Sequence, residues 1–529
     1  MSENEQRKLC WLLLLLVVLV VNLASFPKRL YPCDPYWLRF QVQAWLDGRG
    51  DVPAEYAVVP PIVEGQLFFR NPRNGGYYVK YGPAAALFMA PPVYLWNKMS
   101  GYTIWDVANW YQAFIKKNPA LALEYNLSAC PYSPSLLYFT NHYNLLWSLI
   151  LASILYWSAL HFCKRPILCV IWVLATLFAG FGWNYLRAQT YEIGQWTAAS
   201  LFFACSAYMF DCIEKERRIP ALLWLGAWLS VSGLVLMKSS YILLLPIWLA
   251  VTLWPSGKNT CVDQEKSKAQ QNSLADSLKE FLRRCLTPWV WLPLALLAVV
   301  FLSCNYWRFG GIFCTGYTQW VEEADPLSNN PLIALYGFFF RPDKSIFLHQ
   351  PLLFFSLFAL PSFFKRFPRT AWLISLSFLA NLLLISKYVN WSGGGCYGPR
   401  YLIFILSQLT WPSLLLLDYI WDNWQQLKCK ICSIILVFVL GVSFYFQTRI
   451  NSLDFYTYYK VEGFLSWIGA SDNVLSTYRE RYWGLVCNEL IVLRDRGEKP
   501  YWLQVLEKEN PKGAKMVKEI CIDREMRDN

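Results

Sequence analysis

Long apolar runs separated by short polar turns are the main pattern along this chain. A helix needs roughly 20 mostly apolar residues to cross a bilayer, and eleven runs come close to that length. They lie near residues 10–26, 142–162, 166–186, 193–213, 219–237, 240–255, 288–304, 345–363, 371–387, 400–417 and 431–447. The pattern therefore predicts an all-α polytopic membrane protein with about 11 transmembrane helices.

Basic residues in the turns test this assignment, because Lys and Arg are enriched in loops that stay in the cytoplasm. With these spans, the following basic stretches all fall on one side, which we assign to the cytoplasm: Arg7–Lys8, Lys164–Arg165, Lys215–Arg218, Lys258–Arg284, Lys365–Arg369 and Lys428–Lys430. The agreement requires that residues 82–98 do not cross as a single helix. Pro83, Pro91 and Pro92 interrupt that stretch and favour a juxtamembrane or re-entrant helix.

The same assignment places two long segments on the outer side. Residues 27–141 form an outer first loop rich in aromatic, Pro and Gly residues, and loops of this length are usually functional. Residues 448–529 form a small C-terminal outer region, whose mixture of charged and apolar residues predicts a helical cap. We therefore divide the chain into a transmembrane module, 1–447, and this C-terminal region. We expect the run at 10–26 to be an uncleaved anchor, because no good cleavage site follows it.

Composition supports this class of protein. Hydrophobic residues make up 56% of the chain and charged residues 16%, whereas soluble domains carry about a quarter charged residues. The net charge is +12, but the basic residues are scattered between apolar spans, so the sequence gives no case for nucleic-acid binding. The 16 cysteines contain no zinc pattern, since Cys429 and Cys432 have no second pair nearby. We expect no bound metal and no cofactor.

Some basic residues break the positive-inside pattern and stand on the outer side. They are Lys80, Arg187, Lys238, Arg308, Arg341, Lys344, Lys387 and Arg400. Snorkelling towards lipid headgroups explains many such residues at helix ends. It explains the whole set less well, because several of them stand beside unusual polar turns. If they converge on one outward cavity, they would bind an anion at the membrane surface, above all a phosphate or diphosphate.

A glycine-rich turn at Trp391–Tyr401 gives this site a more specific form. Three consecutive glycines, 393 to 395, let the backbone approach a ligand and turn its N–H groups towards it. Gly398-Pro399 then begins a helix with Arg400 in its first turn, where free N–H donors favour anions. A flexible connector is the alternative interpretation. Trp391, Tyr397 and Tyr401 disfavour it, because aromatic rings stack on sugars and anchor at interfaces.

An acidic residue, Asp34, follows directly after the first apolar run, in Tyr31-Pro-Cys-Asp-Pro-Tyr-Trp-Leu-Arg39. A carboxylate at this membrane–water boundary is costly in hydrocarbon and inexpensive in water. A solvated loop acid that caps a short helix is one interpretation of Asp34. A catalytic acid that faces the outer cations is the other.

Together, several motifs resemble the GT-C superfamily of integral-membrane glycosyltransferases. The closer resemblance is to the bacterial lipid-carrier-dependent branch, related to protein O-mannosyltransferases and aminoarabinose transferases. The matching motifs, in order, are Cys33–Arg39, Asp47-Gly-Arg-Gly50, Tyr77–Pro83 with the proline-rich 87–95 stretch, Tyr185–Glu192, Asn305–Gly310, Thr315-Gly-Tyr317, Tyr336-Gly337, Asp343-Lys-Ser345 and Trp391–Tyr401. They cover most of residues 10–420 and leave the C-terminal region unmatched.

The resemblance implies a role for each of the candidate site residues. The first-loop acid of the family is the catalytic base, and Asp34 matches it. Family members often have a second acid, and Glu192 is the later acid that also lies at the outer surface. The chain has no Asp-x-Asp pair, so we favour a metal-independent mechanism. The substrate-binding set that we expect is Lys80, Arg187, Lys238, Arg308, Lys344, Trp391, Tyr397 and Arg400.

The expected activity is transfer of a hexose from a polyprenyl-phosphate-linked donor on the outer face of the cytoplasmic (inner) membrane. Nucleotide sugars are cytoplasmic, whereas a lipid phosphate sugar suits an outward site at the hydrocarbon boundary. Asp34 would deprotonate the acceptor hydroxyl, with inversion, while Lys80, Arg187 and Arg400 stabilise the leaving phosphate. The acceptor would be an envelope glycan, a lipid or a protein in the periplasm, and membrane lipid would surround the enzyme.

The main alternative is a transporter or flippase of a lipid-linked or anionic substrate, which would also hold charges in a membrane cavity. A transporter should show paired repeats with broken helices at matching positions, and the sequence shows none. A non-enzymatic assembly factor for envelope polymers is a second alternative.

Overall fold

The computed structural model describes residues 2–25, 34–57, 68–117, 143–187, 191–255, 274–316, 326–393, 396–453, 461, 464–466 and 468–522. Most of these residues are helical, and the sheet that they contain is one antiparallel hairpin of β1 (Phe68–Arg70) and β2 (Tyr77–Val79). The all-α fold class predicted from the hydrophobic pattern is therefore confirmed.

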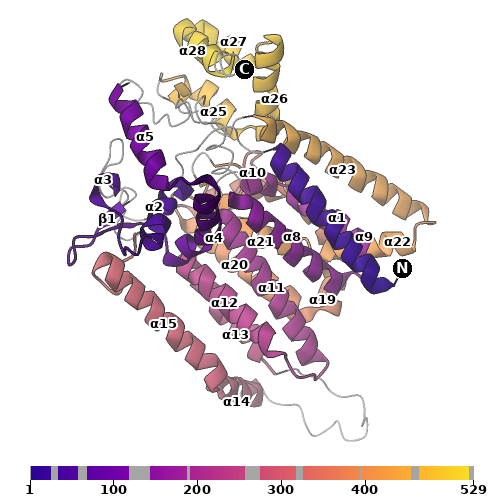
Figure 1. Ribbon diagram of the computed structural model, residues 1–529. Coiled ribbons are helices and arrows are strands. Elements are labelled where there is room, and N and C mark those ends of the chain that lie inside the picture. The colour runs from indigo at the N-terminus through magenta and orange to yellow at the C-terminus, as the bar shows by residue number, and fades with distance from the viewer. Residues whose placement is uncertain are drawn as a thin grey trace, which may run out of the picture.

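The helices fall into three groups along the chain (Figure 1). The membrane bundle contains α1 (Glu3–Ala24), α8 (Tyr143–Phe162), α9 (Pro166–Phe178), α10 (Gly182–Arg187), α11 (Glu192–Glu214), α12 (Ala221–Met237), α13 (Leu244–Leu253), α15 (Pro288–Phe309), α17 (Pro331–Phe340), α18 (Ile346–His349), α19 (Leu352–Arg366), α20 (Pro368–Lys387), α21 (Ile403–Leu409), α22 (Pro412–Asp422) and α23 (Leu427–Ser452). Short 3-10 turns, η2 (Ser239–Leu243) and η3 (Arg400–Leu402), precede α13 and α21. The first loop contains α2 (Asp34–Leu46), α3 (Ala54–Ala57), α4 (Pro83–Ser100) and α5 (Ile104–Lys117), and the C-terminal region contains α25 (Asp472–Glu480), α26 (Trp483–Arg496), α27 (Tyr501–Glu509) and α28 (Pro511–Ile522).

Seven helices of the described residues are long and apolar enough to cross a membrane. They are Glu3–Ala24, Asn144–Phe162, Glu192–Glu214, Pro288–Phe309, Pro368–Lys387, Arg400–Asp422 and Leu427–Ser452. Three further predicted spans appear as shorter apolar helices, Pro166–Phe178, Ala221–Met237 and Ser239–Leu253. The predicted span at 345–363 is divided between α18 and α19, because Pro351 cannot continue the first of them. The chain is thus a multi-pass membrane protein.

Helix α4 agrees with the expectation that residues 82–98 form a helix other than a membrane span, but the prolines do not interrupt it. It runs as one helix from Pro83 to Ser100, and Pro91 and Pro92 do not break it. Pro83 stands at the first helical position, where its missing N–H costs nothing. Packing on α2, α8 and α12 holds the helix together through the two internal prolines. The helix is not one of the seven membrane-crossing candidates.

Helix α11 lies at the centre of the bundle and packs against α8, α12, α20 and α21 (Figure 1). Because it is buried on most sides, its polar groups need partners inside the protein. The Trp196 indole N–H, for example, donates to the Ser407 hydroxyl of α21 at 2.8 Å. Gly194 leaves room for the Phe88 ring of α4, which lies 2.7 Å from the position of an added Cβ. The first turn of α11 is thus fixed against both the bundle and the outer loop.

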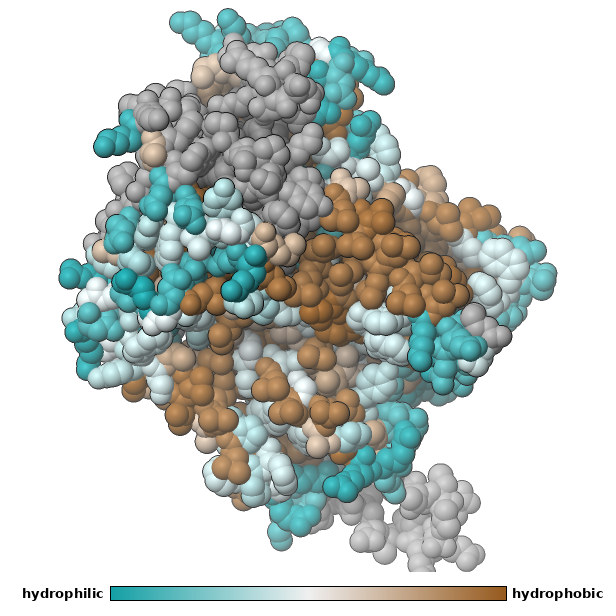
Figure 2. Space-filling model, viewed as in Figure 1, coloured by the Kyte–Doolittle hydropathy of each residue, from teal (hydrophilic) through white to brown (hydrophobic). Residues whose placement is uncertain are grey.

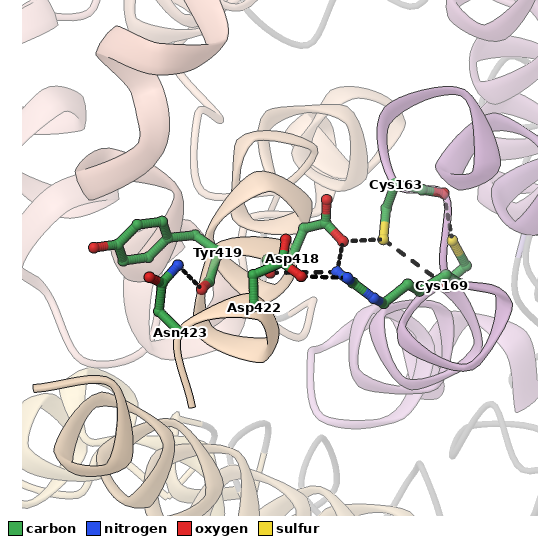
Figure 3. A network of polar contacts seen from close by, with 7 residues as sticks. Cys163, Cys169, Asp418, Tyr419, Asp422 and Asn423 are labelled. Atoms are coloured by element: carbon green, nitrogen blue, oxygen red, sulfur yellow. Dashed lines mark hydrogen bonds and ion pairs between the residues drawn. The ribbon is translucent and has the colours of Figure 1, made fainter. Parts of the chain in front are cut away.

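Two of the basic turns predicted to share one side, at 164–165 and 365–369, lie at the same end of the bundle, where the rings of Phe162 and Phe367 are in contact. Arg165, in the turn between α8 and α9, forms ion pairs with Asp418 and Asp422 of α22, and the Cys163 thiol lies 3.7 Å from the same Asp418 carboxylate (Figure 3). Arg369 donates to the carbonyl of Trp254 at 2.8 Å, next to the end of α13. The hairpin and the C-terminal helices lie at the opposite end (Figure 1).

The surface between the two ends is apolar, as expected for a bundle in lipid. Figure 2 shows brown, apolar residues between teal, polar regions at the extremities. Helices α15 and α23 contribute most to this surface, since only 17% of each membrane window is buried inside the protein. Exposed leucines and aromatic residues on these helices therefore face the bilayer.

Candidate functional site

Arg400 and Glu192 form an ion pair at the end of the bundle that packs against the first loop. Arg400 begins the turn η3, and its Nε donates to Oε1 of Glu192, in the first turn of α11, at 2.5 Å. The Glu192 side chain is only 5% exposed and that of Arg400 17%. A second guanidinium nitrogen, Nη1, lies 2.7 Å from the sulfur of Cys396. Charge-assisted contacts of this kind are strong in a partly buried place, so the pair is well ordered.

Lys238 adds a second cation to this pair. It stands in the turn between α12 and η2, where the chain breaks the apolar run. Its Nζ lies 4.2 Å from the centre of the Tyr401 ring, and the Arg400 guanidinium carbon lies 5.9 Å from the same ring. Burial lowers the pKa of Lys238 to about 8; Arg400 lowers it further, whereas Glu192 raises it. The three side chains thus form one cluster with an excess of positive charge.

The outer first loop brings Lys80 to the same place. Lys80 is 7% exposed and follows strand β2 directly. Two residues later, Gly82 packs closely against the end of α12. A Cβ atom added at Gly82 would lie only 1.9 Å from the Leu236 carbonyl oxygen. The intervening Tyr81 ring lies 5.2 Å from the ring of Tyr191, the residue before Glu192. Lys80 is therefore flanked by the backbone that carries Lys238 and by the backbone that carries Glu192.

The glycine-rich turn packs against the C-terminal region as well as the bundle. Its residues 394 and 395 lie outside the described residues. Tyr397 is fully buried: its carbonyl accepts from the Tyr185 hydroxyl at 2.6 Å, and its hydroxyl accepts from Gln447 at 2.7 Å. The ring of Trp483, from α26, lies 5.0 Å from the Tyr397 ring. Tyr397 thus packs against protein and fixes the turn, and its predicted contact with a ligand stays a prediction.

Trp391 also packs against protein. Gly337 of α17 gives it room, because an added Cβ there would lie 2.1 Å from the indole ring. The ring lies 5.3 Å from that of Phe338, and the guanidinium of Arg341 lies 5.7 Å from it. Arg341 in turn pairs with Asp343 at 2.9 Å. Trp391 therefore closes the site on the side of α17.

Three of the predicted substrate-binding cations bind main-chain carbonyls. Arg187 donates to the carbonyls of Asn451 and Leu453, at 2.5 and 2.9 Å. Lys344 donates to the carbonyls of Cys396 and Gly398, at 2.5 and 3.4 Å. Arg308 donates to the carbonyls of Val79 and Tyr81. Arg308 and Lys344 thus hold loops next to the cluster, and Arg187 holds the end of α23. This role could not be predicted from the sequence, because a main-chain carbonyl partner has no characteristic residue type.

The predicted base, Asp34, begins α2, but its side chain lies outside the described residues. Helix α2 packs against α4 and against β2, the strand that leads into Lys80. Contact between rings supports this packing, because those of Trp37 and Phe68 lie 6.2 Å apart. The helix that carries Asp34 therefore belongs to the same outer assembly as Lys80.

The site contains two kinds of group that can bind a ligand: the amino and guanidinium groups of Lys80, Lys238 and Arg400, and the aromatic ring of Tyr401. Among the residues that the structure describes, no group of three or more His, Cys, Asp or Glu side chains is placed to hold a metal ion. The arrangement is suited to an anion next to an apolar or sugar-like group.

No family model matches the chain, and neither does any curated protein. Among solved structures, it is similar to ArnT from Cupriavidus metallidurans in the apo state, with 11% identity, a TM-score of 0.46, and coverage of 97% of this chain and 77% of that chain. The same protein bound to undecaprenyl phosphate gives 11% identity, a TM-score of 0.41, and coverage of 96% and 77%. The archaeal oligosaccharyltransferase AglB from Archaeoglobus fulgidus, in complex with an inhibitory peptide and a dolichol-phosphate, gives 9% identity, a TM-score of 0.45, and coverage of 89% and 60%. At these low scores, the function is argued from this chain's own residues.

Proposed function

We propose that this protein is a glycosyltransferase that moves a sugar from a polyprenyl-phosphate-linked donor to an acceptor on the outer face of the membrane. The observation that carries the proposal is the cluster of Arg400, Lys238 and Glu192, with Lys80 beside it, at the outer end of a lipid-exposed bundle. The motifs that resemble lipid-carrier-dependent glycosyltransferases supply most of these residues.

The net positive charge of this cluster favours the binding of a phosphate group. Arg400 and Lys238 lie beside one carboxylate, with Lys80 on the adjoining loop, and buried charges of one sign are costly unless a counter-ion joins them. A phosphate group of a lipid donor supplies that counter-ion without leaving the membrane surface. As the sugar departs, the negative charge on the phosphate grows, and the fixed cations then stabilise it more strongly than in the ground state.

The proposed chemistry is a single displacement at the anomeric carbon. Asp34 removes the proton from the acceptor hydroxyl as its oxygen attacks, and the bond to the phosphate oxygen breaks, so the configuration inverts. Lys80, Lys238 and Arg400 bind the leaving phosphate. Glu192 pairs with Arg400 in the empty site and is the second candidate for the base. Arg187 and Lys344 hold the surrounding loops.

The proposed location follows from the sidedness of the basic turns. With those turns in the cytoplasm, the cluster faces the periplasm from the inner membrane, where nucleotide sugars are absent and lipid-linked sugars are available. The acceptor is then a glycan, lipid or protein of the cell envelope.

Purified protein in lipid nanodiscs tests this proposal. We expect it to bind polyprenyl phosphate and to move a labelled sugar from extracted polyprenyl-phosphate lipids to an envelope acceptor, with inversion seen by NMR of the product. Movement of the intact lipid-linked sugar between leaflets, without cleavage of the phosphate–sugar bond, would instead identify a flippase. An absence of both binding and transfer would refute the proposal.

A further inference from the structure

We propose that Arg308 is a positioning residue for Lys80: it holds the backbone on both sides of Lys80 and so fixes the ammonium group in the donor-phosphate site. This inference rests on the proposed function and deepens it. It replaces the direct ligand contact that the sequence suggested for Arg308.

Arg308 donates hydrogen bonds to the residues immediately before and after Lys80 in the sequence. One guanidinium nitrogen, Nη2, donates to the carbonyl of Val79 and, at 2.6 Å, to that of Tyr81. A planar guanidinium binds in a fixed geometry that an ammonium group does not reproduce. Two bonds from one rigid group therefore restrict the backbone dihedral angles immediately before and after Lys80, and with them the direction of its side chain.

The burial of Arg308 is unusual for a structural residue. Its side chain is 2% exposed, and among the described residues no carboxylate pairs with it and its Nε has no hydrogen-bond partner. A buried charge without a counter-ion is destabilising, and a neutral side chain would fill the same place at lower cost. A positive group that holds the Lys80 backbone would offset this cost once a phosphate binds at Lys80, because it adds to the field that attracts the anion.

The last turn of α15 joins this clamp to the hairpin. The Asn71 side chain donates to the carbonyl of Trp307 at 2.7 Å, and the rings of Tyr78 and Trp307 lie 5.5 Å apart. Helix α15 otherwise stands at the edge of the bundle (Figure 1), with 17% of its membrane window buried. The hairpin and the outer end of α15 thus form one unit, and the position of Lys80 depends on that unit rather than on its own strand alone.

A double-mutant cycle tests the proposal, because two residues that act through one another give non-additive effects. The variants are Arg308→Met, Lys80→Met and the pair together, in the full chain in nanodiscs, with polyprenyl phosphate as the probe. We expect each single variant to weaken binding by roughly 10-fold, the loss usual for a charge-assisted hydrogen bond. We expect the double variant to bind no more weakly than Lys80→Met alone. Arg308→Lys should recover only part of the affinity.

Arg369→Met is the matched control. Arg369 also clamps main-chain carbonyls, those of Val251, Thr252 and Trp254, but at the opposite end of the bundle. It should lower thermal stability without changing the affinity for polyprenyl phosphate. If Arg308→Met acted only through general destabilisation, Arg369→Met would weaken binding as well.

Three outcomes would overturn the inference. The first is a double variant that binds about 10-fold more weakly than Lys80→Met, since the effects would then be independent. The second is normal binding by Arg308→Met. The third is a wild-type protein that does not bind polyprenyl phosphate, which would overturn the proposed function as well. If Arg308→Met does not fold, the same cycle is measured with Arg308→Lys, which keeps the charge, and the same criteria apply.

Discussion

Arg400 and Glu192 lie 208 positions apart in the sequence and share an ion pair in a site where the carboxylate is almost fully buried. The pair joins the start of α11 to the end of the glycine-rich turn. Under the proposed function, a donor phosphate would compete with Glu192 for the Arg400 guanidinium. We therefore expect binding of the phosphate and release of Glu192 to be linked steps.

Arg400→Ala should weaken binding of polyprenyl phosphate by roughly 30-fold, because it removes a planar donor and leaves Glu192 without its counter-ion. Arg400→Lys should restore part of the affinity, since an ammonium group keeps the charge but not the planar donor geometry. Binding is measured by titration in nanodiscs. Arg449→Ala is the control, because Arg449 lies at the same end of the bundle and contacts the Tyr445 ring. Equal affinities in wild type and Arg400→Ala would contradict the phosphate role.

Glu192→Gln should raise the affinity for polyprenyl phosphate by roughly 5-fold, because the competing carboxylate is lost and the cluster gains net positive charge. Turnover should fall less than in Asp34→Asn if Glu192 is a counter-ion. Binding and sugar transfer are measured on the same preparation. Lower affinity in Glu192→Gln would show that the carboxylate orders Arg400 rather than competing with the donor.

Asp34→Asn should lower turnover by roughly 10² to 10⁴, the usual contribution of a general base, and leave donor binding near the wild-type value. Asn is among the best helix-capping residues, so a purely structural Asp34 would tolerate it. Transfer of a labelled sugar by purified protein measures the effect. Near-normal turnover in Asp34→Asn would move the role of base to Glu192.

Lys238 should give donor binding a pH dependence. Its pKa of about 8 lies below the ordinary 10.5, so the folded empty protein loses this proton before the unfolded chain does. The empty protein therefore gains stability as the pH rises from about 8 towards 10.5. Binding of an anion needs the protonated form, so the affinity should fall over the same range, as measured by titration at each pH. Lys238→Met should remove most of this fall in affinity. If the affinity of Lys238→Met falls with pH as steeply as that of the wild type, another group causes the pH dependence.

Gly82→Ala should disturb the site through packing alone. The added methyl group would lie 1.9 Å from the Leu236 carbonyl oxygen, so the Lys80 segment must move away from α12. We expect a loss of about 1–3 kcal/mol in stability, as for other overpacked sites, together with weaker donor binding. Gly233→Ala is the control. Gly233 lies on α12, as Leu236 does, but no atom lies within 4 Å of the added group, so this variant should not destabilise the protein. Thermal unfolding and titration measure both effects, and equal behaviour of the two variants would contradict the close packing.

Much of the fold was determined by the sequence alone, since the period and length of apolar runs depend on local physics. An uncharged run of about 20 residues has few alternatives to a helix in lipid, and helices at Glu3–Ala24, Glu192–Glu214 and Pro368–Lys387 appear where the pattern predicted them. The interruptions were harder to predict: Pro351 divides one predicted span, whereas Pro91 and Pro92 leave α4 intact. Whether a proline ends a helix depends on the neighbours that hold it.

The candidate site, like the fold, could be predicted only in part from the sequence. The residue types and their outer position were readable from the sequence, because Lys and Arg at outer helix ends depart from the positive-inside pattern. Which of them share a site was not readable, since each belongs to a different element. Tertiary packing alone placed Arg400 on Glu192 and Lys238 on Tyr401, and it directed Arg187, Arg308 and Lys344 to main-chain carbonyls. The physical reason is that the N–H groups of Lys and Arg donate to any oxygen within reach, and only the folded chain decides which oxygen that is.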